Sequence, residues 1–367
     1  MKRYLKPSVF WLFIFIPVTV LLERIVTSES LVFFSASLSI IPIAKLIGES
    51  TENLAHYTGD TIGGLLNATF GNAPELIIAV MALHAGLHEM VLASLAGAIL
   101  ANLLMATGIS FLVGGIKFHN QEYNPVTIKM YNSMMFLAVY SMLIPSSFHR
   151  FFITGENTVY RQNESNLNIL LAVSLLLAYV FYLYFMIKTH PDLFKSIKKA
   201  PVVKEEEEHE PWSKKKAIGA LIVASVTAAF MSEILVGAAE GTGKELGMSS
   251  AFIGIVFVAV IGGAAESISA ITMAAKNKLD LTISIALGSS IQIALFIAPL
   301  LILLSFFVGP KPMFLNFNRA EIGALLMAVI LTTVVSGDGK SNWFKGIQMI
   351  TLYLLIALLF YFIPEQT

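Results

Sequence analysis

The chain has 367 residues, with 24 basic and 24 acidic side chains, and no cysteine; 56% of its residues are apolar and 13% are charged. A soluble domain usually carries about 25% charged residues, so this share is too small to cover the surface of a soluble enzyme. Zero net charge argues against a nucleic-acid-binding protein. The lack of cysteine excludes disulfides, thiolate metal sites and thiol chemistry. The composition therefore predicts a polytopic membrane protein.

Eleven stretches are long and apolar enough to cross a bilayer as helices, which takes roughly 17–25 residues each. They span residues 8–26, 29–48, 58–84, 89–115, 126–147, 167–187, 216–239, 250–275, 279–308, 318–335 and 344–363. We therefore expect an all-α polytopic membrane protein whose eleven transmembrane helices lie in a lipid bilayer.

Basic residues between these stretches indicate the orientation of the chain, because lysine and arginine resist translocation. With a cytosolic N-terminus, the inner segments hold 18 lysines and arginines and the outer segments hold 6. The sequence thus predicts a cytosolic N-terminus and an external C-terminus. The short chain carries no recognisable targeting segment, so we expect a prokaryotic plasma membrane, with a vacuole-type membrane as the alternative.

The sequence weakly repeats itself after 191 residues, so that Gly71 falls on Gly262 and Glu75 on Glu266. The shift carries the third predicted span onto the eighth. These spans are an odd number apart, so the two copies point in opposite directions. Inverted repeats build many secondary transporters, with the substrate site at the repeat interface. The predicted organisation is an extra N-terminal helix at 1–28, inverted five-helix repeats at 29–188 and 216–367, and a linker at 189–215.

Each copy centres on a short motif near the middle of a long apolar span, at residues 71–75 and 262–266. Pro74 lacks an N–H, and its ring clashes with the carbonyl four residues earlier in a continuous helix. Adjacent glycines at 262 and 263 weaken the second helix by their conformational freedom. Both helices are therefore expected to break or kink and to free backbone carbonyls, which is tolerated at membrane depth around a polar cavity.

The two glutamates of these motifs, Glu75 and Glu266, are expensive to ionise inside a membrane. The cost at a helix centre is about 2.5–3.5 kcal/mol on the lenient insertion scale, so protonated or cation-bound states are favoured. Carboxylate, amide and carbonyl oxygens suit a hard cation such as Ca²⁺. A lone buried glutamate that only makes hydrogen bonds is the alternative. Matching positions in an inverted repeat, each beside a helix breaker, favour the cation site.

Three stretches resemble the signatures of a known family: residues 63–76, Ser232–Val236 and Gly288–Ala294. They are similar to the repeat signatures of the cation/proton exchangers in the cation/Ca²⁺ exchanger superfamily, and the resemblance covers nearly the whole chain. It implies a Ca²⁺/H⁺ antiporter that exports Ca²⁺ from the cytosol, with Glu75 and Glu266 as shared Ca²⁺ and H⁺ ligands. No cofactor is implied.

Two positions depart from the family pattern. Gly263 stands where the second motif usually has asparagine, so one side-chain amide is missing. Pro74 is less usual for this branch and resembles the sodium-coupled relatives. Both departures bear on the affinity or the ion preference of the site.

Other polar residues are weaker candidates. Asn72 and Gln292 are expected as further metal ligands because the family motifs contain them. Asn102 and Ser289 are secondary candidates for the cavity, although an interhelical hydrogen bond explains each equally well. Glu52, Glu233 and Glu240 lie towards span ends, where they either attract cations into access vestibules or are simply solvated.

The linker contains an acidic run at Glu205–Glu208 and Glu210. Such a run is usually a solvated linker, while the resemblance suggests Ca²⁺ gathering or regulation. The main alternative function is Na⁺/Ca²⁺ exchange. An intramembrane hydrolase would need a nucleophile–base pair or a metal-binding histidine cluster within the predicted spans, and the sequence has neither there. A channel is disfavoured because an inverted repeat around a midplane site suits alternating access better. The oligomeric state is left open and includes a homo-oligomer.

Overall fold

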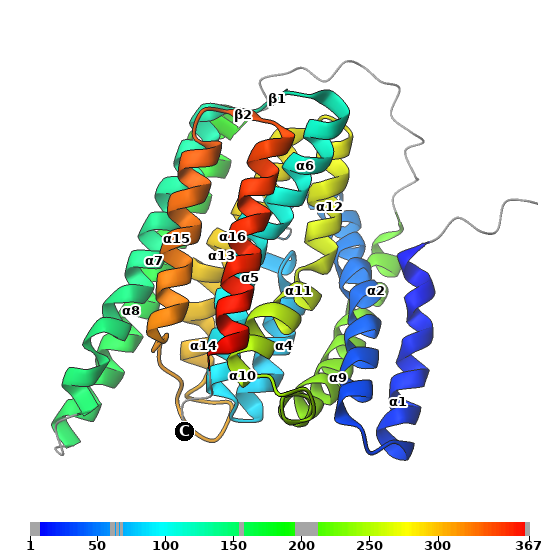
Figure 1. Ribbon diagram of the computed structural model, residues 1–367, viewed down its shortest axis with the longest axis vertical. Coiled ribbons are helices and arrows are strands. Elements are labelled where there is room, and N and C mark those ends of the chain that lie inside the picture. The colour runs from blue at the N-terminus through cyan, green and yellow to red at the C-terminus, as the bar shows by residue number, and fades with distance from the viewer. Residues whose placement is uncertain are drawn as a thin grey trace, which may run out of the picture.

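The computed structural model describes residues 8–58, 63, 66, 69–153, 158–194 and 212–363, without side chains at 148–153 and 158–162. The predicted acidic run at 205–210 lies outside these residues. Figure 1 shows a bundle of upright helices, with α1 and α2 at one edge and α7, α8 and α15 at the other. A single apolar core runs through the bundle.

Helices form nearly all of the described chain. In its first half these are η1 Val9–Ile14, α1 Phe15–Ile25, α2 Glu29–Ala55, α4 Ala73–His84, α5 His88–Leu100, the π-helix η2 Ala101–Ala106, α6 Thr107–Phe118, α7 Pro125–Ile153, α8 Thr158–Tyr184, the π-helix η3 Phe185–Thr189 and η4 Pro191–Phe194. In its second half they are α9 Lys214–Leu246, α10 Ser250–Phe252, the π-helix η5 Ile253–Val258, α11 Ala259–Gly262, α12 Ala264–Ala275, α13 Leu279–Gln292, the π-helix η6 Ile293–Ile297, α14 Ala298–Leu304, α15 Arg319–Ser336 and α16 Trp343–Phe362.

Seven helices in the described part of the chain are long and apolar enough to cross a membrane, and an eighth span is bent by 59° between residues 262 and 264. Together they cover eight of the eleven expected stretches. The other three expected stretches do not coincide with any of these eight spans. The stretch at 8–26 forms η1 and α1, and the stretch at 126–147 lies in α7. The stretch at 58–84 is described only in part, and its helix α4 has 12 residues.

The helix boundaries repeat with the same period as the sequence. Adding 191 to the bounds of α4 gives those of α12, and the start of α5 falls on the start of α13. The end of α2 falls likewise on the end of α9. In Figure 1, α4 and α12 leave the middle of the bundle in opposite directions.

Helices α2 and α9 pack along each other and are joined by hydrogen bonds at both ends. At one end, the Glu245 carboxylate accepts hydrogen bonds from the Ser28 hydroxyl and the backbone N–H of Glu29. At the other end, the backbone N–H of Trp212 donates to Asn53 Oδ1 over 2.8 Å. The end of each helix thus binds the start of the other, and α9 also packs against α4.

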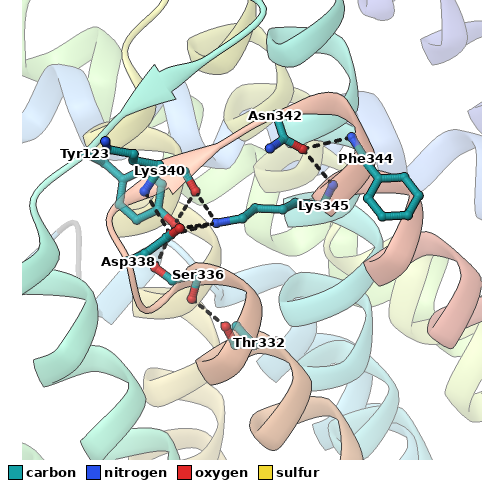
Figure 2. Close-up of polar contacts among 8 residues, drawn as sticks. All are labelled: Tyr123, Thr332, Ser336, Asp338, Lys340, Asn342, Phe344 and Lys345. Atoms are coloured by element: carbon teal, nitrogen blue, oxygen red, sulfur yellow. Dashed lines mark hydrogen bonds and ion pairs between the residues drawn. The ribbon is translucent and has the colours of Figure 1, made fainter.

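A short β-ribbon connects distant parts of the chain at the upper end of Figure 1, where β1 (Gln121–Glu122) pairs antiparallel with β2 (Lys340–Ser341). Figure 2 shows its polar contacts: the Tyr123 hydroxyl donates to the Ser336 carbonyl over 2.8 Å, and Lys345 Nζ binds Asp338 Oδ1 at 2.6 Å. Burial raises the pKa of Tyr123. Burial opposes ionisation of Asp338, but hydrogen bonds from Lys345 and the Lys340 backbone lower its pKa overall.

The broken helix of the second half crosses α5 at very short range. A Cβ on Gly97 would lie 2.3 Å from the Ile255 carbonyl oxygen, and a Cβ on Gly254 would lie 2.8 Å from Ala93 Cβ. Only glycine permits this approach, as in close helix contacts within membranes. The crossing holds η5 and α11 against α5 and so fixes the second break beside the first half of the chain.

Candidate functional site

Both predicted helix breaks are present, and each places a glutamate in the first turn of a new helix. Residues 71 and 72 form a turn before α4, and Pro74 occupies the first turn of α4, where its missing N–H costs little. Gly263 separates α11 from α12. Glu75 and Glu266 are the third residues of α4 and α12. The unpaired N–H groups of a helix start favour negative charge there.

Glu75 is buried, and the half-buried Glu266 has a buried Oε2. Glu75 is only 8% exposed, and its Cγ lies 3.2 Å from where a Cβ of Gly262 would stand. Glu75 therefore packs directly against the second break. Both oxygens of Glu75 and Oε2 of Glu266 are buried, without a hydrogen-bond partner among the described residues. Buried carboxylate oxygens in this state call for a proton or a cation.

A chain of side-chain hydrogen bonds runs beside the two glutamates. Gln292 Nε2 donates to the Thr69 carbonyl at 3.3 Å, and Asn72 Nδ2 donates to Gln292 Oε1 at 2.8 Å. The Ser289 hydroxyl donates to Asn72 Oδ1, and Asn102 Nδ2 donates to Ser289 Oγ at 3.1 Å. The chain joins the start of α4, the end of α13 and the start of η2. All four side chains are at least 95% buried.

π-Helical turns adjoin this polar chain. Asn102 lies in η2, and Gln292 directly precedes η6. A π-turn displaces the regular backbone hydrogen bonds, and such turns are frequent at functional sites. The Asn102 carbonyl accepts a hydrogen bond from Thr107 Oγ1 at 2.8 Å. The widened turns thus direct the Asn102 side chain inward while its backbone stays satisfied.

The sequence-predicted residues fall into two groups. Glu75, Glu266, Asn72, Gln292, Asn102 and Ser289 come together in the interior. Glu52, Glu233 and Glu240 are exposed, and no interaction joins them to the glutamate pair among the described residues. The same part of the chain contains no group of three or more histidine, cysteine, aspartate or glutamate residues that could hold a metal ion. A cation here would need amide or backbone oxygens as well.

One of the exposed candidates, Glu240, lines a cavity of about 310 Å³ between α9, α10 and the turn from α4 to α5. Glu89 and His88 line this cavity too, and neither was predicted from the sequence as a site residue.

A further carboxylate, Glu321, is buried at the start of α15, where it forms a capping box with Asn318. The spacing of Asn318 and Glu321 is the signal that identifies this role.

Comparison with known proteins agrees with this architecture. The family model described as sodium/calcium exchanger protein matches residues 28–188 and 216–362. The Ca²⁺/H⁺ antiporter of Aphanothece halophytica is 38% identical over 97% of this chain and 96% of its own length. The Ca²⁺/H⁺ antiporter ChaA of Bacillus subtilis is 40% identical over 94% of this chain and 96% of its own.

The solved structure of native YfkE superposes on this chain with a TM-score of 0.81 at 36% identity, covering 97% of this chain and 100% of that one. The predicted resemblance to cation exchangers is thereby confirmed. The apolar helices and these relatives identify an integral membrane protein. The chain belongs to the sodium/calcium exchanger protein family.

Proposed function

We propose that this protein exchanges Ca²⁺ for H⁺ across a membrane, with protons and Ca²⁺ competing for Glu75 and Glu266. One observation carries the proposal: Glu75 packs against the helix break that precedes Glu266, and three of the four oxygens of these two carboxyls are buried without a hydrogen-bond partner among the described residues. Relatives that match nearly the full chain are named as Ca²⁺/H⁺ antiporters, which supports the choice of ions.

The charge balance of the pair explains how the two fluxes are coupled. Two protons or one Ca²⁺ neutralise two carboxylates. The empty, doubly charged pair would cost about 5–7 kcal/mol, twice the insertion-scale cost of one charge at mid-membrane. That cost prevents the empty carrier from changing its orientation. With two protons per Ca²⁺, one pH unit supplies about 2.7 kcal/mol and sustains a roughly 100-fold Ca²⁺ gradient.

We further propose that two inverted five-helix repeats, 29–188 and 216–367, alternate access to this pair. The extra helix at 1–28 and the two repeats together make eleven spans, and the linker at 189–215 joins the repeats. The matching boundaries of α4 and α12, and their opposite directions, support this arrangement. The excess of inner basic residues supports a cytosolic N-terminus, and the proposed location is a prokaryotic plasma membrane. In that orientation the protein exports Ca²⁺ from the cytosol while H⁺ enters.

The second candidate is Na⁺/Ca²⁺ exchange, which Pro74 favours through its likeness to sodium-coupled relatives. Against it, the hydrogen-bonded side chains beside the two glutamates are all neutral: Asn72, Gln292, Ser289 and Asn102. A further carboxylate would be the natural support for additional Na⁺ sites, and Gln292 stands where one could have been.

Ca²⁺ uptake into everted vesicles separates these functions. The vesicles are given a pH gradient, a Na⁺ gradient or neither, and vesicles without the protein serve as the control. Uptake that follows the pH gradient in the absence of Na⁺ supports Ca²⁺/H⁺ exchange. Uptake that follows the Na⁺ gradient and ignores pH supports the second candidate.

A further inference from the structure

Two cavities meet at the end of the bundle where α9 ends and α10 begins, at the lower end of Figure 1. The first is the cavity of about 310 Å³ beside the turn from α4 to α5, which His88 and Glu89 line. The second holds about 470 Å³ and lies beside the end of α16. Glu240 and Ser250 line both cavities, so the two spaces join at these side chains.

The first cavity reaches the place where α5 and η5 cross. Met90 and Ile253 line it, and the next residue of η5, Gly254, lies against α5. A Cβ on Gly254 would stand 2.8 Å from Ala93 Cβ and 3.1 Å from the Met90 carbonyl oxygen. Along η5 and α11, this contact stands between the cavity and the second helix break. The crossing therefore separates the cavity from the glutamate pair.

The second cavity reaches the membrane surface. Tyr361 and Phe362 line it in the last turn of α16, and they are 42% and 76% exposed. Aromatic side chains in such positions are typical of the boundary between membrane and water. Lys244, in the last turn of α9, lines the same cavity. In the proposed orientation α9 and α16 both end outside, so this cavity opens on the outer side.

We propose that the two cavities form an outer vestibule, in which Glu240 binds a hydrated divalent cation weakly on its way between the external solution and the glutamate pair. The inference rests on the proposed exchange of Ca²⁺ for H⁺. Glu89 and Glu240 line the first cavity, and none of its described lining residues is a lysine or arginine. A cleft lined by one sign of charge raises the local concentration of the opposite ion.

The binding at Glu240 is weak because too few ligands converge there. The described part of the chain has no group of three or more histidine, cysteine, aspartate or glutamate residues placed to hold a metal ion. A cation beside Glu240 therefore keeps most of its water. Weak binding suits a path that ions must both enter and leave.

The repeat places an equivalent acid at the opposite end of the bundle in a different setting. Glu240 falls on Glu49 after the shift of 191 residues. Lys45 Nζ lies 3.7 Å from Glu49 Oε1, whereas the repeat partner of Lys45 is the apolar Val236. Within the described residues, no ion pair neutralises Glu240. Its charge is available to a cation, and the effect of that charge is confined to the outer side.

Charge-removing variants test the vestibule because their effect should depend on the side of the membrane. The half-saturating Ca²⁺ concentration is measured at low salt from outside, with acid-loaded right-side-out vesicles, and from the cytosolic side, with everted vesicles. Glu240→Gln should raise the external value about threefold and leave the cytosolic value unchanged. Lys244→Gln, which removes a positive charge from the second cavity, should lower the external value. Glu23→Gln, at an exposed glutamate on α1, is the matched control and should keep both values.

The absence of cysteine from the chain allows a second test that needs no transport. Ser250→Cys introduces a single thiol where the two cavities join, and Glu23→Cys introduces one at an exposed position outside them. A positively charged, membrane-impermeant methanethiosulfonate added outside should modify both variants. External Ca²⁺ should slow the reaction of Ser250→Cys at least about twofold and leave that of Glu23→Cys unchanged.

Three results would overturn the inference: an external value that Glu240→Gln leaves unchanged, equal shifts on both sides, or a thiol at 250 that the external reagent does not reach or Ca²⁺ does not protect. The parent protein is also tested for pH-gradient-driven Ca²⁺ flux. Absence of that flux would reject the proposed function, whereas the protection of the thiol at 250 decides the vestibule alone.

Discussion

The two broken helices carry the same acid in different surroundings. Glu75 and Glu266 occupy equivalent positions after a shift of 191 residues, and each begins a new helix. The first break is made by a turn and Pro74, and its Asn72 is held in the hydrogen-bond chain. The second break is made by glycines and has no amide of its own.

The asymmetry extends to every side chain that donates in this chain of hydrogen bonds. The repeat partners of Asn72, Asn102, Ser289 and Gln292 are Gly263, Ile293, Ala98 and Ala101. None of these partners has a polar side chain. The repeat therefore preserves the carboxylates, which in the proposed mechanism load and release the ions, whereas the neutral polar side chains beside them have no counterpart in the other repeat. Ion preference should depend on the asymmetric residues, and proton coupling on the symmetric ones.

The largest expected effect comes from neutralising either member of the symmetric pair. Glu75→Gln and Glu266→Gln should each reduce pH-gradient-driven Ca²⁺ flux in liposomes to the level of empty liposomes, because glutamine cannot trade a proton for a cation. Glu23→Gln, at an exposed glutamate on α1, is the matched control and should transport at the parental rate. Near-parental exchange in either site variant would show that the pair does not carry the coupled ions.

The repeat-related glycines Gly97 and Gly288 should differ sharply in their tolerance of a side chain. A Cβ on Gly97 would meet the Ile255 backbone at 2.3 Å, whereas a Cβ on Gly288 meets nothing described within 4 Å. Gly97→Ala should lower the melting temperature, because overpacking costs about 1–3 kcal/mol. Gly288→Ala should leave it unchanged or raise it slightly, since alanine stabilises a helix by roughly 0.5–1 kcal/mol over glycine. Equal melting temperatures would contradict the short crossing of α5 and η5.

Removing hydrogen bonds of the neutral side chains beside the two glutamates, with both carboxylates kept, should impair transport less. Gln292→Met keeps the size of the side chain and removes its contacts with Thr69 and Asn72, so Asn72 is no longer held in one orientation. We expect a Ca²⁺ Kd raised by about tenfold, as for other changes behind metal ligands, with proton coupling retained. Calorimetry and flux measured together test this, and lost coupling at an unchanged Kd would count against it.

The smallest effect is expected at the β-ribbon. The pKa of Asp338 is lowered in the folded protein, so its ion pair with Lys345 contributes stability above the ordinary aspartate pKa and loses it as pH falls through the lowered value. The Asp338 side chain is 57% exposed, and solvent screening limits the pair to under about 1 kcal/mol. A double-mutant cycle of Asp338→Asn and Lys345→Met should give this coupling near neutral pH and none in acid. A coupling independent of pH would refute the assignment.

The sequence predicted the breaks and the paired glutamates because proline, glycine and intramembrane charge have strong local meaning. Pro74, the glycines at 262 and 263, and the period of 191 residues were sufficient for this. The hydrogen-bond chain could not be predicted, because its direction depends on a backbone carbonyl at Thr69 that meets Gln292 only after folding. Asn72 and Gln292 could be chosen from motifs, but the orientation of Asn102 could not.

Two further features of the fold were not predicted from the sequence. The stretch at 126–147 was predicted as a span from its apolar residues, and it lies in the longer helix α7, Pro125–Ile153. The fastening of α2 to α9 depends on Glu245, which reads in sequence as an ordinary exposed acid near a helix end and binds residues more than 200 positions away.

The central claim is that Ca²⁺ and protons replace each other on Glu75 and Glu266. Proton release on adding Ca²⁺ to the purified protein, in weakly buffered detergent solution with a pH indicator, tests it most directly. The account predicts that Ca²⁺ binding releases protons, up to two per ion, that binding weakens as the pH falls, and that the Glu75→Gln and Glu266→Gln double variant releases none. Ca²⁺ binding of unchanged affinity at every pH, without proton release, would contradict it.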